Sequence, residues 1–227
     1  MRVLGLIPAR GGSRRITNKN LAVLEGKTLV RRALETSIAA GCFATVGLSS
    51  EDPAILAEAD GLPVELLERP PELATDTALT YDVVIHALSA LDGTAFDAVA
   101  VVQCTSPFTA PEDLAGTVEL LERTGAESAV SVTELESGLH PWKLKRLEGD
   151  RLLPFIQDDE MKPSHELPPL WIRNGSVYVS RRSVIDGGRL VSDDVRGYPM
   201  PAERSLDIDT ERDLEFARFL LERKGRG

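Results

Sequence analysis

This chain of 227 residues has few cysteines, no long apolar run and no signal-peptide pattern, as is typical of an ordinary globular protein. Its two cysteines, Cys42 and Cys104, lie far apart and lack C-x-x-C spacing, so we expect two buried thiols in a reduced, cytoplasmic protein. No apolar run approaches the roughly 20 residues that cross a bilayer. The start of the chain also lacks the pattern of a signal peptide. These absences argue against a disulfide scaffold, a cysteine metal site and a membrane partner.

Acidic residues are absent from the first 24 positions, although the whole chain has a formal net charge of -10. The cations in this stretch are Arg2, Arg10, Arg14, Arg15 and Lys19. A narrow cluster of positive charge in an acidic chain indicates that one small, highly charged anion binds there. A nucleic-acid surface would need a wider basic face, so we expect no nucleic-acid partner.

Apolar runs typical of buried strands alternate with helical patterns along most of the chain. The strand patterns are VLGLI (3–7), ATVGLSS (44–50), PVELLE (63–68), FDAVAVVQC (96–104), ESAVSVTEL (127–135) and WIRNGSVYVS (171–180). The helical patterns are 27–41, 52–59, 78–91, 111–125 and a last helix within 204–224. This alternation predicts right-handed crossovers and an α/β fold, with a mostly parallel sheet between helices.

The alternation breaks between residues 137 and 170, a stretch rich in proline and charge with two short strand-like pieces. We interpret it as an arm inserted into a single domain that spans residues 1–227. Its apolar side chains, with Trp142 and Phe155 among them, would leave the arm poorly folded alone, which predicts a homodimer formed through it.

The sequence IPARGGSRRITNKNL follows the first strand and precedes a helix, where free backbone N–H groups can bind phosphate oxygens. Gly11 and Gly12 would let the backbone come close, and Arg10, Arg14 and Lys19 would donate charge-assisted hydrogen bonds. The alternative is a solvated basic turn. The loop is not G-x-G-x-x-G, and the GKT at 26–28 has no glycine five positions earlier, so neither a dinucleotide fingerprint nor a P-loop is present.

Six blocks in order resemble the CMP-sialic acid synthetase-like cytidylyltransferases, which activate acylneuraminate and other nonulosonate sugars. The opening loop is similar to their signature IPARGGSKGIPxKNI. The other blocks are RPPELATDTALTYDVVIHAL, QCTSPF, HPWK, IRNGSVYV and SLDIDTERDL. The resemblance implies a Rossmann-like nucleotidyltransferase fold. It also implies transfer of CMP from CTP to the anomeric hydroxyl of a 3-deoxy-ulosonic acid, with release of pyrophosphate and use of Mg²⁺.

The resemblance further implies roles for individual residues. Those implied in catalysis are Arg10, Lys19 and Asp209. Those implied in CTP binding are Ala9, Gly11, Gly12, Ser13, Arg14, Asn20, Arg69, Thr80 and Gln103, with Asp76 and Thr77 holding the loop beside them. Those implied in binding the acceptor are Ser106, Lys143, Arg173, Asn174 and Gly175, where Lys143 would reach across a dimer interface into the neighbouring site.

Asp207 and Asp209 are the implied magnesium ligands. Because they lie two residues apart on an extended segment, their carboxylates would point the same way. Mg²⁺ usually takes one or two protein carboxylates and completes its shell with water and phosphate oxygens. The alternative is that these aspartates cap the last helix. The acceptor hydroxyl would lose its proton with help from either the metal or an aspartate.

Departures from the family pattern leave the acceptor open. Ser164 stands where relatives often carry an arginine that helps to recognise the sugar acid, and Arg173 is a candidate to compensate. Arg15 replaces a glycine of the sialic-acid enzymes. The eight-carbon acid Kdo and a small phosphonate are therefore alternative acceptors. An alternative from another class is a regulator that binds CTP without turning it over.

Overall fold

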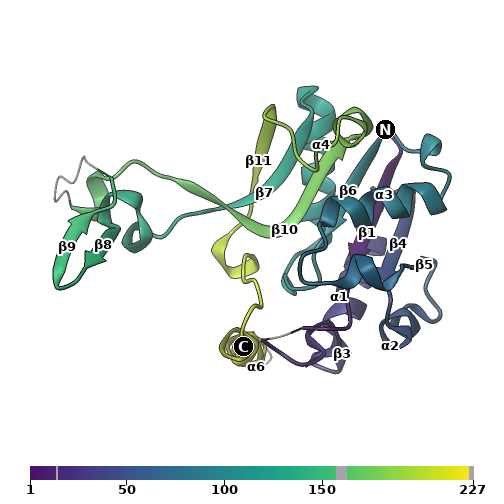
Figure 1. The fold of residues 1–227 in the computed structure, drawn as a ribbon, viewed down its shortest axis with the longest axis horizontal. Coiled ribbons are helices and arrows are strands. Elements are labelled where there is room, and N and C mark those ends of the chain that lie inside the picture. Colours follow the sequence, from purple (N-terminus) through teal and green to yellow (C-terminus); the bar gives the residue numbers. More distant parts are fainter. Residues whose placement is uncertain (14, 157–162, 225–227) are drawn as a thin grey trace.

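The computed structural model describes residues 1–13, 15–156 and 163–224, and its centre is a seven-stranded sheet in the order β11-β7-β10-β6-β1-β4-β5 (Figure 1). The strands are β1 (Val3–Pro8), β4 (Thr45–Ser50), β5 (Glu65–Glu68), β6 (Ala98–Val102), β7 (Ser128–Glu134), β10 (Trp171–Arg181) and β11 (Val195–Pro199). β10 runs antiparallel to β6 and β7, whereas the other neighbouring pairs are parallel. The predicted mostly parallel sheet is confirmed, and β10 makes it a mixed sheet.

Helices cover both faces of this sheet, as predicted. α1 (Leu29–Ala39), α4 (Pro111–Thr124) and α6 (Glu211–Lys224) contribute to one buried apolar cluster, and α3 (Thr80–Ala90) and α5 (Arg182–Asp186) contribute to a second. α2 is the short helix Pro53–Leu56. Short 3-10 helices are η1 (Lys19–Leu21), η2 (Ala57–Ala59), η3 (Pro71–Ala74), η4 (Gly93–Ala95), η5 (Ser137–Leu139), η6 (Pro141–Lys143), η7 (Ser164–Glu166) and η8 (Ala202–Arg204).

Local signals in the sequence account for the ends of the first long helix. Thr28, the last residue of the GKT tripeptide, caps α1 by accepting a hydrogen bond from the backbone N–H of Arg31 at 3.1 Å. Val30 and Leu34, four residues apart, have no exposed surface. Gly41 follows the helix with a φ of +63°, which glycine adopts readily. The GKT sequence is thus a helix start.

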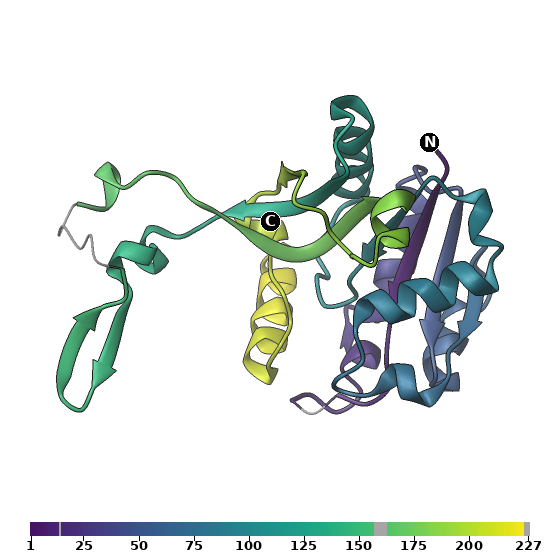
Figure 2. The same ribbon diagram turned by 45° about the horizontal axis from the view of Figure 1, so that its top comes forward.

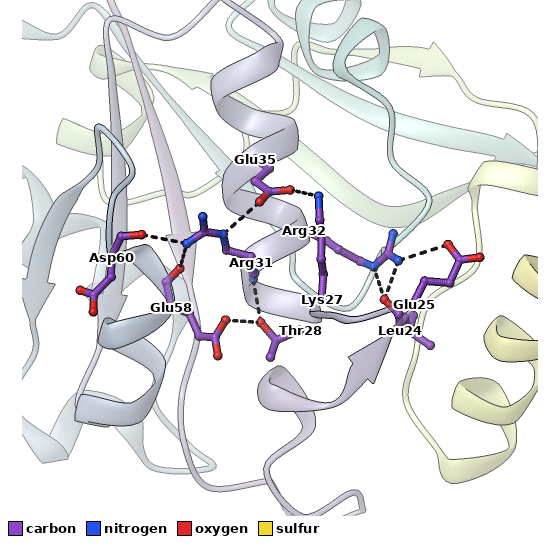
Figure 3. Close-up of polar contacts among 9 residues, drawn as sticks. All are labelled: Leu24, Glu25, Lys27, Thr28, Arg31, Arg32, Glu35, Glu58 and Asp60. Atoms are coloured by element: carbon purple, nitrogen blue, oxygen red, sulfur yellow. Dashed lines mark hydrogen bonds and ion pairs between the residues drawn. The ribbon is translucent and has the colours of Figure 1, made fainter.

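A polar network fixes α1 to the segments on either side of it (Figure 3). Both Nε and Nη2 of Arg32 donate to the backbone oxygen of Leu24, at 3.1 and 2.5 Å, in the small hairpin of β2 (Val23–Leu24) and β3 (Lys27–Thr28). Arg31 donates to Glu35 and to the backbone oxygens of Glu58 and Asp60. The hairpin that follows the basic loop is therefore held against a rigid helix.

The described part of the stretch 137–170, which comprises residues 137–156 and 163–170, stands away from the sheet domain (Figures 1 and 2). Its two strand-like pieces are β8 (Lys145–Glu148) and β9 (Arg151–Pro154), which pair antiparallel in a separate two-stranded sheet. Leu147, Leu152 and Phe155 are all more than 60% exposed. The single-domain organisation, the inserted arm and dimerisation through it stay predictions.

The strand β11, the helix α5 and the β2–β3 hairpin were not expected from the sequence. β11 is short and mostly exposed, so it has no apolar run that would mark it as a strand. Within the described ranges no helix is both long enough and apolar enough to cross a membrane.

Candidate active site

A cavity of about 270 Å³ lies at the carboxyl ends of β1, β5 and β6, where open α/β sheets bind ligands. Six predicted residues line it: Arg10, Lys19, Asn20, Arg69, Thr80 and Gln103. They come from segments that span residues 10–103, and only the parallel order of the strands brings them together. The two predicted catalytic cations and four of the nine residues predicted to bind CTP therefore line one cavity.

The cations of the basic loop have acidic neighbours that are distant in the sequence. Nη1 of Arg10 donates to Oδ1 of Asp76 at 2.8 Å. Nζ of Lys19 lies 3.2 Å from Oδ1 of Asp209 and also donates to the backbone oxygen of Ile208 at 2.9 Å. Arg15 lies 3.5 Å from Asp209. The cations of the loop are therefore paired with carboxylates that lie far away in the sequence, which a simple solvated turn would not require.

Glu51 was missed by the sequence analysis, although it follows β4 at the edge of the sheet that carries the cavity. Its Oε1 accepts from the backbone N–H of Gly11 at 2.7 Å, and its Oε2 accepts from Nε and Nη2 of Arg69, both at 3.1 Å. Arg69 is only 5% exposed. One carboxylate thus connects the basic loop to the buried arginine of the cavity.

Gly11 has protein neighbours on two sides. Its backbone N–H donates to Glu51, and a Cβ at this position would lie 2.6 Å from Oδ2 of Asp52, so a larger residue would require the Asp52 side chain to shift. Gly12 has open space around it and meets the steric requirement for close approach of a phosphate. The sequence contained a signal for Glu51. This acid directly follows a strand pattern, and open α/β sheets bind ligands at the carboxyl ends of their strands.

Two other loop residues bond to neighbouring backbone. Ala9 is fully buried, and its N–H donates to the backbone oxygen of Ser49. Nδ2 of Asn20 donates to the backbone oxygen of Arg10 at 2.9 Å and so shapes the loop. Ser13 does not line the cavity. Arg14 lies outside the described residues.

The two predicted metal ligands lie on the extended segment between η8 and α6. The pKa of the Asp207 carboxyl is raised, first by desolvation and then by the charge of Asp209, while a hydrogen bond with Thr105 and the charge of Lys19 oppose the rise. The aspartates are therefore close enough to repel each other, and a cation would relieve that repulsion. No group of three or more His, Cys, Asp or Glu side chains suited to a metal occurs among the described residues.

Helix capping, the alternative for these aspartates, is done by other residues. Oδ2 of Asp213 accepts from the backbone N–H groups of Thr210 and Asp209, at 2.7 and 3.1 Å, and Thr210 Oγ1 accepts from the N–H of Asp213. This is the reciprocal pattern of a capping box. The Asp209 carboxylate takes no part in it and stays available to a cation.

The predicted acceptor residues are not all brought to one place. Gly175 lies beside the aspartates, because a Cβ added there would be 3.4 Å from Oδ2 of Asp207. Arg173 is exposed on β10, close enough for its charge to act on Tyr178. Lys143 lies in the arm, where Nζ donates to Oγ of Ser164 at 2.7 Å, and it does not line the cavity.

Two predicted acceptor residues, Asn174 and Ser106, are buried in the structure. Asn174 is 7% exposed and its amide faces inward, accepting from Ser131 Oγ at 2.6 Å and donating to Ser205 Oγ at 2.9 Å. Ser106 is 4% exposed and lines a separate small void beside Thr109. The Asn174 amide is engaged by protein neighbours, whereas Ser106 Oγ is buried with no hydrogen-bond partner among the described residues. Neither side chain lines the cavity, and their roles toward an acceptor stay predictions.

The known proteins with similar sequences are cytidylyltransferases and CMP-sugar-acid synthases. The cytidylyltransferase family model matches residues 4–161. The CMP-N,N'-diacetyllegionaminic acid synthase of Legionella pneumophila is 31% identical over 98% of this chain and 97% of that protein. The N-acylneuraminate cytidylyltransferase of Escherichia coli is 28% identical over 99% of this chain, which spans only 53% of that longer relative.

Solved structures agree on the fold. A CMP:2-keto-3-deoxy-manno-octonic acid synthetase complexed with CTP aligns with a TM-score of 0.73 at 17% identity, over 99% of this chain and 100% of that one. A 4-diphosphocytidyl-2C-methyl-D-erythritol synthase from Anaerococcus prevotii aligns with a TM-score of 0.66 at 14% identity, over 97% and 96%. With the family model covering more than half of its length and a relative matched end to end, this chain belongs to the cytidylyltransferase family, among its CMP-sialic acid synthetase-like members.

Proposed function

We propose that this enzyme transfers CMP from CTP to the anomeric hydroxyl of a nonulosonic acid, and that it uses Mg²⁺. The observation that carries the proposal is the convergence of Arg10, Lys19 and Arg69 on one cavity, with Asp209 in contact with Lys19. A legionaminic-type acid is the favoured acceptor, because the relative named for that acid is matched over almost its whole length.

The residues of the chain can support such a transfer mainly through charge. The acceptor oxygen forms a bond to the α-phosphorus of CTP while the bond from that phosphorus to the bridging oxygen breaks, and the acceptor hydroxyl gives up its proton. CTP brings about four negative charges, and more charge develops on the departing pyrophosphate. Arg10 and Lys19 stabilise this charge by hydrogen bonds that replace those now made to Asp76 and Asp209.

The donor set at Asp207 and Asp209 suits Mg²⁺. Both side chains offer hard carboxylate oxygens, and the pKa of Asp207 is raised first by burial and then by the charge of Asp209. Two carboxylates leave coordination positions for phosphate oxygens and water, which is the usual arrangement for this ion. When bound, Mg²⁺ would polarise the phosphate and offset its charge.

A homodimer is part of the proposal. The root of the arm and α6 border an apolar hollow of about 680 Å³, whose lining includes Leu139, Ile172 and Phe216. Together with the exposed side chains of Leu152 and Phe155 in the arm, it offers a surface that a second copy could cover. Sedimentation at micromolar concentration should give a dimer, and a monomer would contradict this part. The free thiols Cys42 and Cys104 support a reducing, cytoplasmic location.

Kdo is the second candidate acceptor, because a Kdo-activating enzyme shares the fold with a TM-score of 0.73. A small phosphonate is the third, and a CTP-binding regulator without turnover is the candidate from another class. One experiment separates them: a screen of pyrophosphate release with the four nucleoside triphosphates against legionaminic, sialic, pseudaminic and Kdo acids and simple phosphonates. We expect release with CTP and a nonulosonic acid. CTP binding without release with any acceptor would favour the regulator.

Lys19→Ala tests the role of the loop in the same assay. We expect turnover to fall by about 10²–10³-fold, as for loss of one strong donor to a developing negative charge. Lys27→Ala is the matched control, since Lys27 forms an ion pair with Glu35 outside the cavity and should keep normal turnover. Unchanged turnover in Lys19→Ala would contradict the proposed phosphate role.

A further inference from the structure

The segment that carries Asp207 and Asp209 has neither helix nor strand structure, so its position depends on side-chain and backbone ties. Between the two aspartates, Ile208 has no exposed surface, and its N–H donates to the backbone oxygen of Thr105 at 2.8 Å. The backbone oxygen of Ile208 accepts from Nζ of Lys19 at 2.9 Å. These contacts attach the middle of the segment to the end of β6 and to the basic loop.

The start of the segment is attached to α4. Arg204, which directly precedes the segment, donates from Nε and Nη2 to the two carboxylate oxygens of Asp113, at 2.8 and 2.7 Å. Asp113 has no exposed surface, and its Oδ2 also accepts from the backbone N–H of Ala110 at 2.9 Å. The next residue, Ser205, accepts from Nδ2 of Asn174 at 2.9 Å.

This arrangement is more specific than the surface ion pairs of the chain. A paired, two-bond contact between arginine and carboxylate fixes both distance and orientation. Removing the partner of a buried carboxylate strongly destabilises the folded state, so the pairing of Asp113 with Arg204 is favoured in the folded protein. Asp113 itself lies in the first turn of α4, a 14-residue helix with a proline at its start. The segment therefore begins at a point fixed by a rigid element.

We propose that Arg204 and Asp113 are positioning residues of the metal site: the pair sets where Asp207 and Asp209 stand relative to the cavity. This inference depends on the proposed function, because it assigns those aspartates to a divalent cation. Small displacements of ligating groups are costly, since supporting contacts around metal ligands typically change metal affinity by about 10–100-fold.

The test uses Arg204→Lys, which keeps the charge but cannot reproduce the two parallel hydrogen bonds. The readout is the affinity of the enzyme for Mn²⁺ in the presence of CTP and the absence of acceptor, measured from the electron paramagnetic resonance of free Mn²⁺ and corrected for Mn²⁺ bound to CTP alone. We expect affinity about 10–100-fold weaker than in the wild type. Arg182→Lys is the matched control: Arg182 is 31% exposed against 32% for Arg204 and pairs with Asp186, away from the segment.

Thermal unfolding separates positioning from a purely structural role. Mn²⁺ affinity equal to that of the wild type, with or without a lower midpoint of unfolding, would overturn the inference. If Arg204→Lys does not fold, Ser205→Ala takes its place, since it removes the tie to Asn174 and should also weaken Mn²⁺ binding. A wild-type enzyme that binds no Mn²⁺ with CTP would overturn the metal assignment as well. Normal Mn²⁺ binding without pyrophosphate release would contradict only the proposed function.

Discussion

Asp209→Asn should tighten the binding of metal-free CTP but lower turnover in Mg²⁺. The two effects differ in sign because this carboxylate faces both the cations of the loop and the proposed metal. Its oxygens lie 3.2 Å from Nζ of Lys19 and 3.5 Å from Nη1 of Arg15. Without a divalent ion, CTP must compete with this carboxylate for the same cations. With Mg²⁺, the carboxylate should instead hold the ion that accompanies the triphosphate.

The expected gain in affinity for metal-free CTP follows from how exposed the ion pairs of Asp209 are. The Asp209 side chain is 55% exposed, so each of its two ion pairs contributes at most about 1 kcal/mol. Removing the charge should therefore tighten the binding of metal-free CTP by about three- to tenfold, at about 1.4 kcal/mol for each factor of ten. In Mg²⁺ the same variant should lose most of its turnover.

The assay is calorimetric titration of CTP into the enzyme, once in EDTA and once in excess Mg²⁺. Asp194→Asn is the control, because Asp194 forms an exposed ion pair with Arg196 that takes no part in the cavity. The melting temperature of Asp209→Asn should stay near that of the wild type, since Thr210 and Asp213 cap α6. Weaker binding of CTP in EDTA would refute the idea that phosphate and Asp209 compete for Lys19.

Two further predictions concern neighbouring carboxylates. Because the pKa of Asp207 is raised in the folded state, its ionisation lowers stability as the pH rises from its ordinary value of 3.8 through the raised value. Asp207→Asn should therefore unfold at a higher temperature than the wild type at pH 7 in EDTA, and this gain should vanish at low pH; a lower midpoint at pH 7 would contradict the reasoning. Glu51→Gln leaves Arg69, which is 5% exposed, without a charged partner, and breaking such a pair costs about 3–5 kcal/mol. We expect a lower melting temperature and a raised KM for CTP, partly restored in Glu51→Asp; a KM equal to that of the wild type would show that Glu51 does not position Arg69 for the nucleotide.

The sequence by itself determined most of the strands and long helices, and the family to which the chain belongs. Periodic apolar runs and end signals such as Thr28 and Gly41 are local, because a strand or helix of this kind is set by neighbours within a few residues. The blocks that resemble the cytidylyltransferases are also contiguous. They were enough to predict the mostly parallel sheet, the cavity cations and the family that the similar proteins confirm.

Only the tertiary structure decided which side chains meet. The sequence did not reveal that β10 runs antiparallel between β6 and β7, because strand direction depends on the path of the chain and not on local pattern. The partners of Lys19 and Arg204 lie 190 and 91 residues away, and Asn174 turned inward. Ion pairs and buried amides of this kind form between segments that the order of the strands brings together, so no local spacing could have predicted them.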